Sequence, residues 1–87
     1  MTKKDELIRR CVEQLERMAG DNSVPKNIRR TASEVRLEIL DSSKDLSMRS
    51  ATAISMLEEI GSDPNMPLQT RTRIWEIVSQ LETVSVD

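Results

Sequence analysis

The 87-residue chain has no histidine, tyrosine or phenylalanine, and only one cysteine, one tryptophan and two glycines. Without histidine, the usual acid–base residue and metal ligand at neutral pH is missing. The single cysteine, Cys11, cannot form an intramolecular disulfide, which agrees with a reducing compartment. No nucleophile paired with a base and no phosphate-binding loop can be named. We therefore expect no enzyme, no cofactor and no metal site.

An excess of charge of one sign is also lacking. The net charge is −2: residues 1–43 carry nine basic and eight acidic side chains, and residues 44–87 carry four basic and seven acidic ones. So small an asymmetry disfavours nucleic acid as a partner and opposes adsorption on an anionic membrane. The chain has no apolar run of about 20 residues and no signal-like segment. We expect a cytoplasmic protein that does not contact membranes.

Apolar residues, in contrast, recur at spacings of three and four, the period of an α-helix. This period predicts four helices, over residues 3–19, 24–41, 46–60 and 66–83. Thr2 and Asp5 predict a capping box, and Ser23 and Asp45 predict the N-caps of the second and third helices. Gly20 is predicted to end the first helix in a left-handed conformation. The predicted core consists of Leu7, Ile8, Cys11, Val12, Leu15, Met18, Ala19, Ile28, Ala32, Val35, Ile39, Leu46, Ala53, Ile54, Leu57, Ile60, Ile74, Ile77, Val78 and Leu81.

The two halves of the chain resemble each other at a shift of 42 residues. The matching pairs include Leu15 and Leu57, Glu16 and Glu58, Asp21 and Asp63, Pro25 and Pro67, Arg29 and Arg71, and Val35 and Ile77. Short loops favour antiparallel neighbours, so residues 3–41 and 46–83 are predicted to form two helical hairpins. We expect one all-α domain over residues 1–87, with four antiparallel helices in a compact bundle. A short HEAT-like repeat stack is the alternative, because its period is similar.

Several stretches also carry a family resemblance. They are Val24–Arg30, Arg49–Ser55, Asp63–Leu68 and Arg71–Glu82. These stretches resemble a short archaeal family known only as uncharacterised protein family 0147, and the resemblance extends over residues 7–82. It implies an all-helical fold and an archaeal cytoplasmic protein. It implies no activity and no site residues, because the family has none assigned.

Trp75 is the only aromatic residue, and it lies off the apolar arc of the last helix, about 100° from Ile74. One interpretation is a partner-facing patch of Leu68, Arg71 and Trp75, in which the guanidinium lies over the indole. The other is that Trp75 closes the rim of the core, which we expect first because large aromatic side chains are highly buried on average.

Leu37 lies about 180° from Ile28 on the second helix, opposite that helix's predicted core residues. A leucine in that position has no partner within its own hairpin. It either packs on another subunit or is one of the scattered surface leucines that need no explanation. The small apolar content of the chain is a reason to consider self-association.

Arg29 and Arg30 belong to the densest basic grouping, and arginine suits phosphate recognition. Acidic residues on the same helices favour a solvated, salt-bridged face instead. The function we expect is a small interaction or scaffold module that binds itself or another protein through Leu37, Leu68, Arg71 and Trp75. The alternative is a weak nucleic-acid accessory protein that contacts phosphate through Arg29 and Arg30.

Overall fold

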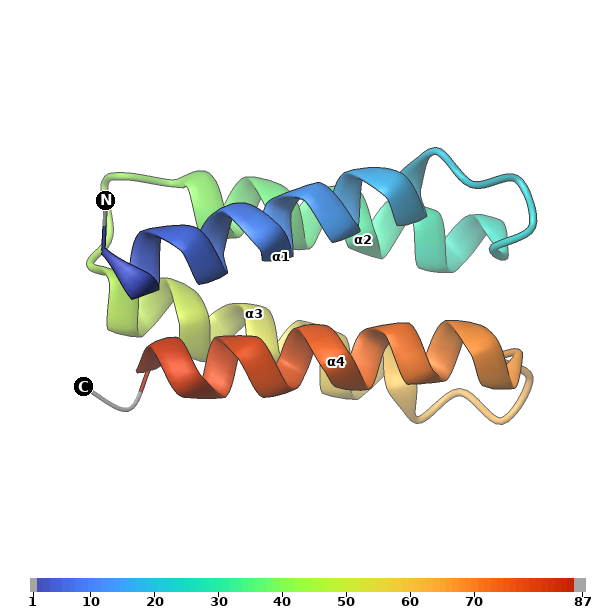
Figure 1. Ribbon diagram of the computed structural model, residues 1–87. Coiled ribbons are helices and arrows are strands. Elements are labelled where there is room, and N and C mark those ends of the chain that lie inside the picture. Colours follow the sequence, from blue (N-terminus) through green and yellow to red (C-terminus); the bar gives the residue numbers. More distant parts are fainter. Residues whose placement is uncertain (1, 86–87) are drawn as a thin grey trace.

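The computed structural model describes residues 2–85, which form four helices joined by three short loops (Figure 1). The helices are α1 (Lys3–Ala19), α2 (Lys26–Leu40), α3 (Leu46–Gly61) and α4 (Leu68–Ser85). Figure 1 shows the chain reversing direction at each loop, so that successive helices run antiparallel. No strand occurs in residues 2–85, and the predicted all-α fold is confirmed. No helix in this part of the chain is both long and apolar enough to cross a bilayer.

The helices form a closed ring of contacts. α1 packs against α2 and α4, and α3 also packs against α2 and α4. A stack of two helical repeats would instead place α1 beside α3 and α2 beside α4. Neither of these pairs is in contact within the described residues. The arrangement, 35 × 21 × 21 Å along its principal axes, is therefore the four-helix bundle and not the repeat stack.

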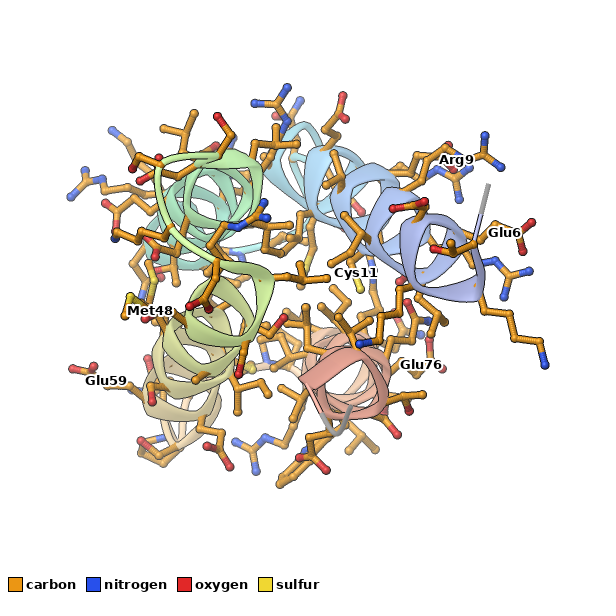
Figure 2. The ribbon with its side chains drawn as sticks, turned by 90° about the vertical axis from the view of Figure 1, so that its left-hand side faces the viewer. Glu6, Arg9, Cys11, Met48, Glu59 and Glu76 are labelled. Carbon is orange, nitrogen blue, oxygen red and sulfur yellow. The ribbon has the colours of Figure 1, made fainter. Side chains whose placement is uncertain are left out.

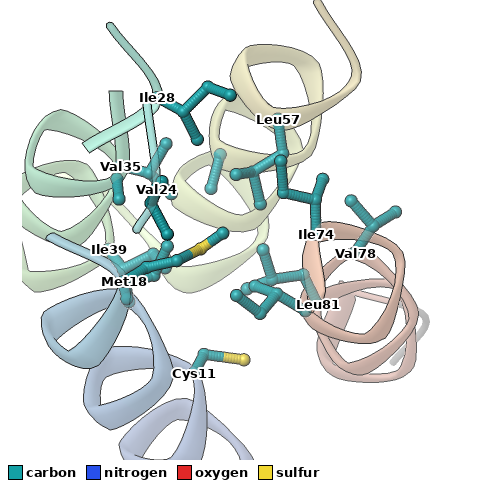
Figure 3. Packing of buried hydrophobic residues seen from close by; sticks show 14 of the residues in the cluster. Cys11, Met18, Val24, Ile28, Val35, Ile39, Leu57, Ile74, Val78 and Leu81 are labelled. Atoms are coloured by element: carbon teal, nitrogen blue, oxygen red, sulfur yellow. The ribbon is translucent and has the colours of Figure 1, made fainter. Parts of the chain in front are cut away.

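The predicted apolar arcs provide most of the core. Met18 of α1, Ile39 of α2 and Leu81 of α4 meet between the helices (Figure 3). The buried apolar residues are Cys11, Leu15, Met18, Val24, Ile28, Ala32, Val35, Ile39, Ala53, Leu57, Met66, Ile74, Ile77, Val78, Leu81 and Val84. Val84 was not among the predicted core residues because α4 continues two residues past its predicted end.

The predicted start of α2 at residue 24, with Ser23 as N-cap, is wrong. The N–H and Oγ of Ser23 donate to Asp21 Oδ1, at 2.9 and 2.7 Å. The N-cap is Pro25, whose carbonyl accepts the first helical hydrogen bonds. Proline disfavours the helical conformation in the residue before it, so Val24 stays outside the helix and its side chain is buried instead. α4 likewise begins after a proline, Pro67, two residues later than predicted.

All three loops are built on the same aspartate turn. The carboxylates of Asp21, Asp41 and Asp63 each accept the backbone N–H of the residue two positions on, at 2.9, 3.0 and 2.9 Å. Their carbonyls accept the N–H three positions on, at 3.0, 3.3 and 3.2 Å. The next helix begins five residues after each aspartate. Each turn therefore reverses the chain with a side chain that also satisfies a backbone donor.

Of the other predicted helix ends, two N-caps are as predicted and the conformation of Gly20 differs. Thr2 and Asp5 form the capping box, and Asp45 Oδ1 accepts the N–H of Met48 at 2.8 Å. Gly20, predicted to be left-handed, is right-handed, with φ −95° and ψ 0°. The N–H of Asp21 donates to the Met18 carbonyl at 3.3 Å, so the helical sense continues through Gly20 into the loop.

Candidate functional site

The four residues predicted to contact a partner lie on two separate parts of the surface. Leu68 and Trp75, which are 78% and 59% exposed, lie in the first half of α4 with the half-buried Arg71. Leu37 is 63% exposed but belongs to α2, which does not contact α4. The exposure of Trp75 shows that the indole does not close the rim of the core. The structure thus brings together Leu68, Arg71 and Trp75 and leaves Leu37 apart.

Arg71 is held by the preceding loop. Its Nη2 donates to the carbonyl of Asp63 at 2.8 Å, whereas the sequence placed this guanidinium over the Trp75 indole. A charged donor on a loop carbonyl makes a comparatively strong hydrogen bond. Arg71 therefore fastens the α3–α4 loop, and the exposed part of the patch is provided by Leu68 and Trp75.

Trp75 stands beside a groove between α3 and α4, which we call the α3/α4 groove. Its volume is about 220 Å³, and it is lined by Leu57, Glu58, Gly61, Ser62, Ile74, Trp75 and Val78. Figure 3 shows Leu57 of α3 and Ile74 of α4 meeting between the two helices, with Val78 beside Ile74. A Cβ at Gly61 would lie 3.8 Å from Ile74 Cγ2, so the glycine leaves this part of the groove open.

Glu58 and Gly61 were not predicted from the sequence as groove residues. The 42-residue shift could have found Gly61, because it pairs Gly61 with Ala19 and Trp75 with Ser33, but not Glu58, which it pairs with the identical Glu16. Such differences between matching positions mark a place where the two hairpins present different surfaces.

A second and larger hollow, of about 490 Å³, lies between α2 and α3. Its walls include Glu34 of α2, Glu59 of α3 and Asp63 of the following loop. In Figure 2, which looks along the bundle, Glu59 points away from the helices into open space. Among residues 2–85 no group of three or more potential ligands could hold a metal ion. This hollow also has no exposed aromatic side chain, and we regard the α3/α4 groove as the better candidate site.

Cys11 is enclosed by the core. Its Sγ donates to Gln80 Oε1 at 3.3 Å, and its side chain lies inside the bundle (Figure 2). Burial raises the pKa of the Cys11 thiol from 9.0 to about 11. A reactive cysteine has a lowered pKa and access to solvent. The thiol has neither property and is a structural residue.

The arginines proposed to contact phosphate differ in their surroundings. Arg29 is half-buried, and its Nη1 donates to Asn22 Oδ1 of the preceding loop at 3.4 Å. Arg30, the next residue, is exposed. Arg29 is therefore directed to its own loop, as Arg71 is in the second hairpin, whereas Arg30 is open to solvent.

An ion pair connects the two hairpins near one end of the bundle. Arg73 Nη1 of α4 lies 3.1 Å from Asp21 Oδ2 in the α1–α2 loop. Hydrogen bonds from Ser23, assisted by Arg73, hold the pKa of Asp21 below its ordinary value. The aspartate of the first loop thus serves both its own turn and the contact with α4.

Comparisons with known proteins place this geometry among related chains. A model of the family described as Uncharacterised protein family (UPF0147) matches residues 1–84. A UPF0147 protein of Methanosarcina mazei is 50% identical over 82 residues, covering 94% of this chain and 88% of the relative. A UPF0147 protein of Sulfurisphaera tokodaii is 48% identical over 77 residues, covering 88% and 86%.

Two solved structures share the fold. A crystal structure of a UPF0147 protein from Thermoplasma acidophilum matches with a TM-score of 0.91 at 34% identity, covering 94% of this chain and 96% of the other. The crystal structure of the protein MMP1188, of unknown function, matches with a TM-score of 0.87 at 43% identity, covering 91% and 90%. Neither the relatives nor the structures are described by an activity.

Proposed function

Because the chain belongs to the uncharacterised protein family UPF0147, whose description assigns no activity, we propose from its surface that it is a small protein-interaction module. It binds another polypeptide through the α3/α4 groove. The observation that carries the proposal is the exposure of Trp75, the only aromatic side chain, beside an apolar groove floor. Tryptophan is enriched among the residues that dominate binding energy at protein interfaces.

The placement of Trp75 has a cost that binding would offset. A buried aromatic removes about 150–250 Å² from water, and this chain is only 37% hydrophobic. The bundle nevertheless leaves its largest apolar side chain outside, with Leu68 exposed on the same helix. A partner that covers the patch would recover the burial that folding leaves unused.

The dimensions of the groove favour a side chain over a cofactor. Its volume, about 220 Å³, lies below the roughly 300–1,000 Å³ of typical small-molecule sites. The high pKa and burial of Cys11 also support a non-catalytic role, and a lone free cysteine agrees with a cytoplasmic location. These features together support polypeptide recognition.

Photo-crosslinking from the patch tests the proposal. A photoreactive amino acid replaces Leu68, and the matched control replaces Lys26, which lies 42 residues earlier at the same place in the first hairpin. In native extract treated with nuclease, we expect a crosslinked polypeptide from position 68 and not from position 26. A strict monomer by light scattering, with equal background at both positions, would contradict the proposal.

A further inference from the structure

The two hairpins treat one matching glutamate differently. In the first hairpin, Arg36 Nε of α2 lies 3.6 Å from Glu16 Oε1 of α1. At a shift of 42 residues these positions become Val78 and Glu58. Within residues 2–85 no side-chain hydrogen bond or ion pair reaches the Glu58 carboxylate. The first hairpin pairs its carboxylate with an arginine, whereas the second places the carboxylate beside an apolar side chain in the α3/α4 groove.

The end of α3 also lacks the basic residue that the end of α1 has. α1 has Arg17 in its last turn, where a cation complements the helix dipole. The matching residue of α3 is Glu59, which follows Glu58 directly, and no basic residue lies in that turn. Glu58, on the groove side of this helix C-terminus, therefore has no cation on its own helix end, and a cation supplied from outside would be favourable beside it.

The surface of α4 beside the groove is apolar at two positions where the matching surface of α2 in the first hairpin is polar. Lys26 and Ser33 of α2 correspond to Leu68 and Trp75 of α4. The face of an indole attracts an arginine or lysine within about 6 Å of the ring centre. The second hairpin thus combines an apolar floor, an aromatic face and an unpaired carboxylate around one groove.

We infer that the occupant of the α3/α4 groove is a basic amphipathic segment of a partner protein. Its arginine or lysine lies between Glu58 and Trp75, and its apolar side chains cover Leu57, Ile74 and Val78. This inference rests on the proposed function and specifies the partner's chemistry. The charge balance agrees with it, since residues 44–87 carry seven acidic and four basic side chains.

Fluorescence titration tests the inference, because Trp75 is the only aromatic residue and reports directly on its own surroundings. The probes are three synthetic helical peptides with one leucine stripe, which differ only in flanking arginine, glutamine or glutamate. We expect the arginine peptide to bind about tenfold more tightly than the glutamine peptide, and the glutamate peptide to bind most weakly. The preference should shrink as added salt screens the charges.

Two isosteric variants locate the effect. Glu58→Gln should remove most of the preference for arginine over glutamine while leaving the affinity for the glutamine peptide unchanged. Glu16→Gln, the matching change in the first hairpin, should leave the preference intact. Both substitutions keep the size of the side chain, and circular dichroism confirms that each variant is folded.

The outcomes separate this inference from the proposed function. If arginine and glutamine peptides bind equally, or if Glu58→Gln keeps the full preference, the basic partner is wrong although a polypeptide partner stands. If the protein forms a dimer in which a second copy fills the groove, the basic partner is wrong and the second copy is the occupant. If no peptide changes the Trp75 emission, the inference fails, and the crosslinking from position 68 alone decides the proposed function.

Discussion

At the residue scale, Cys11 has the most nucleophilic side chain of the protein and is also one of its most buried residues. Cys11 is 0% exposed, and its thiol donates to Gln80 of α4. Because burial disfavours the thiolate, the pKa of the thiol rises to about 11. The same burial makes Cys11 a reporter of opening of the contact between α1 and α4.

Thiol modification should therefore distinguish the folded from the unfolded chain. With a pKa raised by burial from 9.0 to about 11, the thiolate fraction at pH 8 falls about a hundredfold. We expect Ellman's reagent to react at least that much more slowly in native buffer than in guanidinium chloride. Cys11→Ala provides the blank. Complete reaction of the native protein within the mixing time would show that the core opens readily.

Trp75 shows how far single residues can be predicted. The helical period placed Ile74, Ile77, Val78 and Leu81 in the core, and all four are buried. The same period placed Trp75 beside the apolar arc, at an angle that does not determine whether the indole is buried or exposed. Its exposure depends on how closely α3 approaches α4, which is a tertiary property.

At the element scale, apolar periodicity located the helices, and local hydrogen bonds set their ends. α1 has the predicted bounds, and α3 differs only by including Gly61. α2 and α4 begin after Pro25 and Pro67, because proline keeps the residue before it out of the helical conformation. The repeated aspartates were visible in the sequence. That the Asp21 turn uses the Ser23 hydroxyl, which then does not cap α2, became clear only from the geometry.

The N-cap of α3 allows a direct test of an element. Asp45 Oδ1 accepts the N–H of Met48 at 2.8 Å, and Asp45→Ala removes this acceptor from the start of the helix. We expect a loss of about 1 kcal/mol in the free energy of unfolding, measured by urea denaturation. Ser47→Ala, an exposed change in the same turn, should have little effect. Equal losses in both variants would mean that the cap is not the cause.

At the scale of the whole molecule, the ring of helix contacts joins the two hairpins twice. α2 packs on α3 and α1 packs on α4, and the Arg73–Asp21 ion pair adds a polar link at 3.1 Å. This order of packing could not be read from the sequence. Periodicity predicts the apolar side of each helix but not the helix on which that side packs. A four-helix bundle and a repeat stack can both be built from the same four helices.

The loop and cap aspartates predict how stability depends on pH. Hydrogen bonds from Thr2, Ser23 and Ser43 hold the pKa values of Asp5, Asp21 and Asp41 below their ordinary value. Each carboxylate is therefore more acidic in the folded state. Its stabilisation is present above the unfolded pKa of about 3.9 and is lost as the pH falls through the lower folded value.

We therefore expect these aspartates to lower the urea midpoint as the pH is reduced from 5 to 3. Asp21→Asn keeps an oxygen acceptor for the turn but does not titrate, so the decline should be shallower in that variant. An equally steep decline in the variant and the parent would assign the acid sensitivity to other groups.

The first and last helices begin and end, respectively, at the same end of the bundle, and they lie against each other (Figure 1). A mechanical load applied through these two helix ends would act across the helix axes. The α1–α4 contact would then open like a zipper, one helical turn after another, instead of resisting along its whole length. Under tension the bundle is therefore a soft element, although its helices are packed on a continuous core.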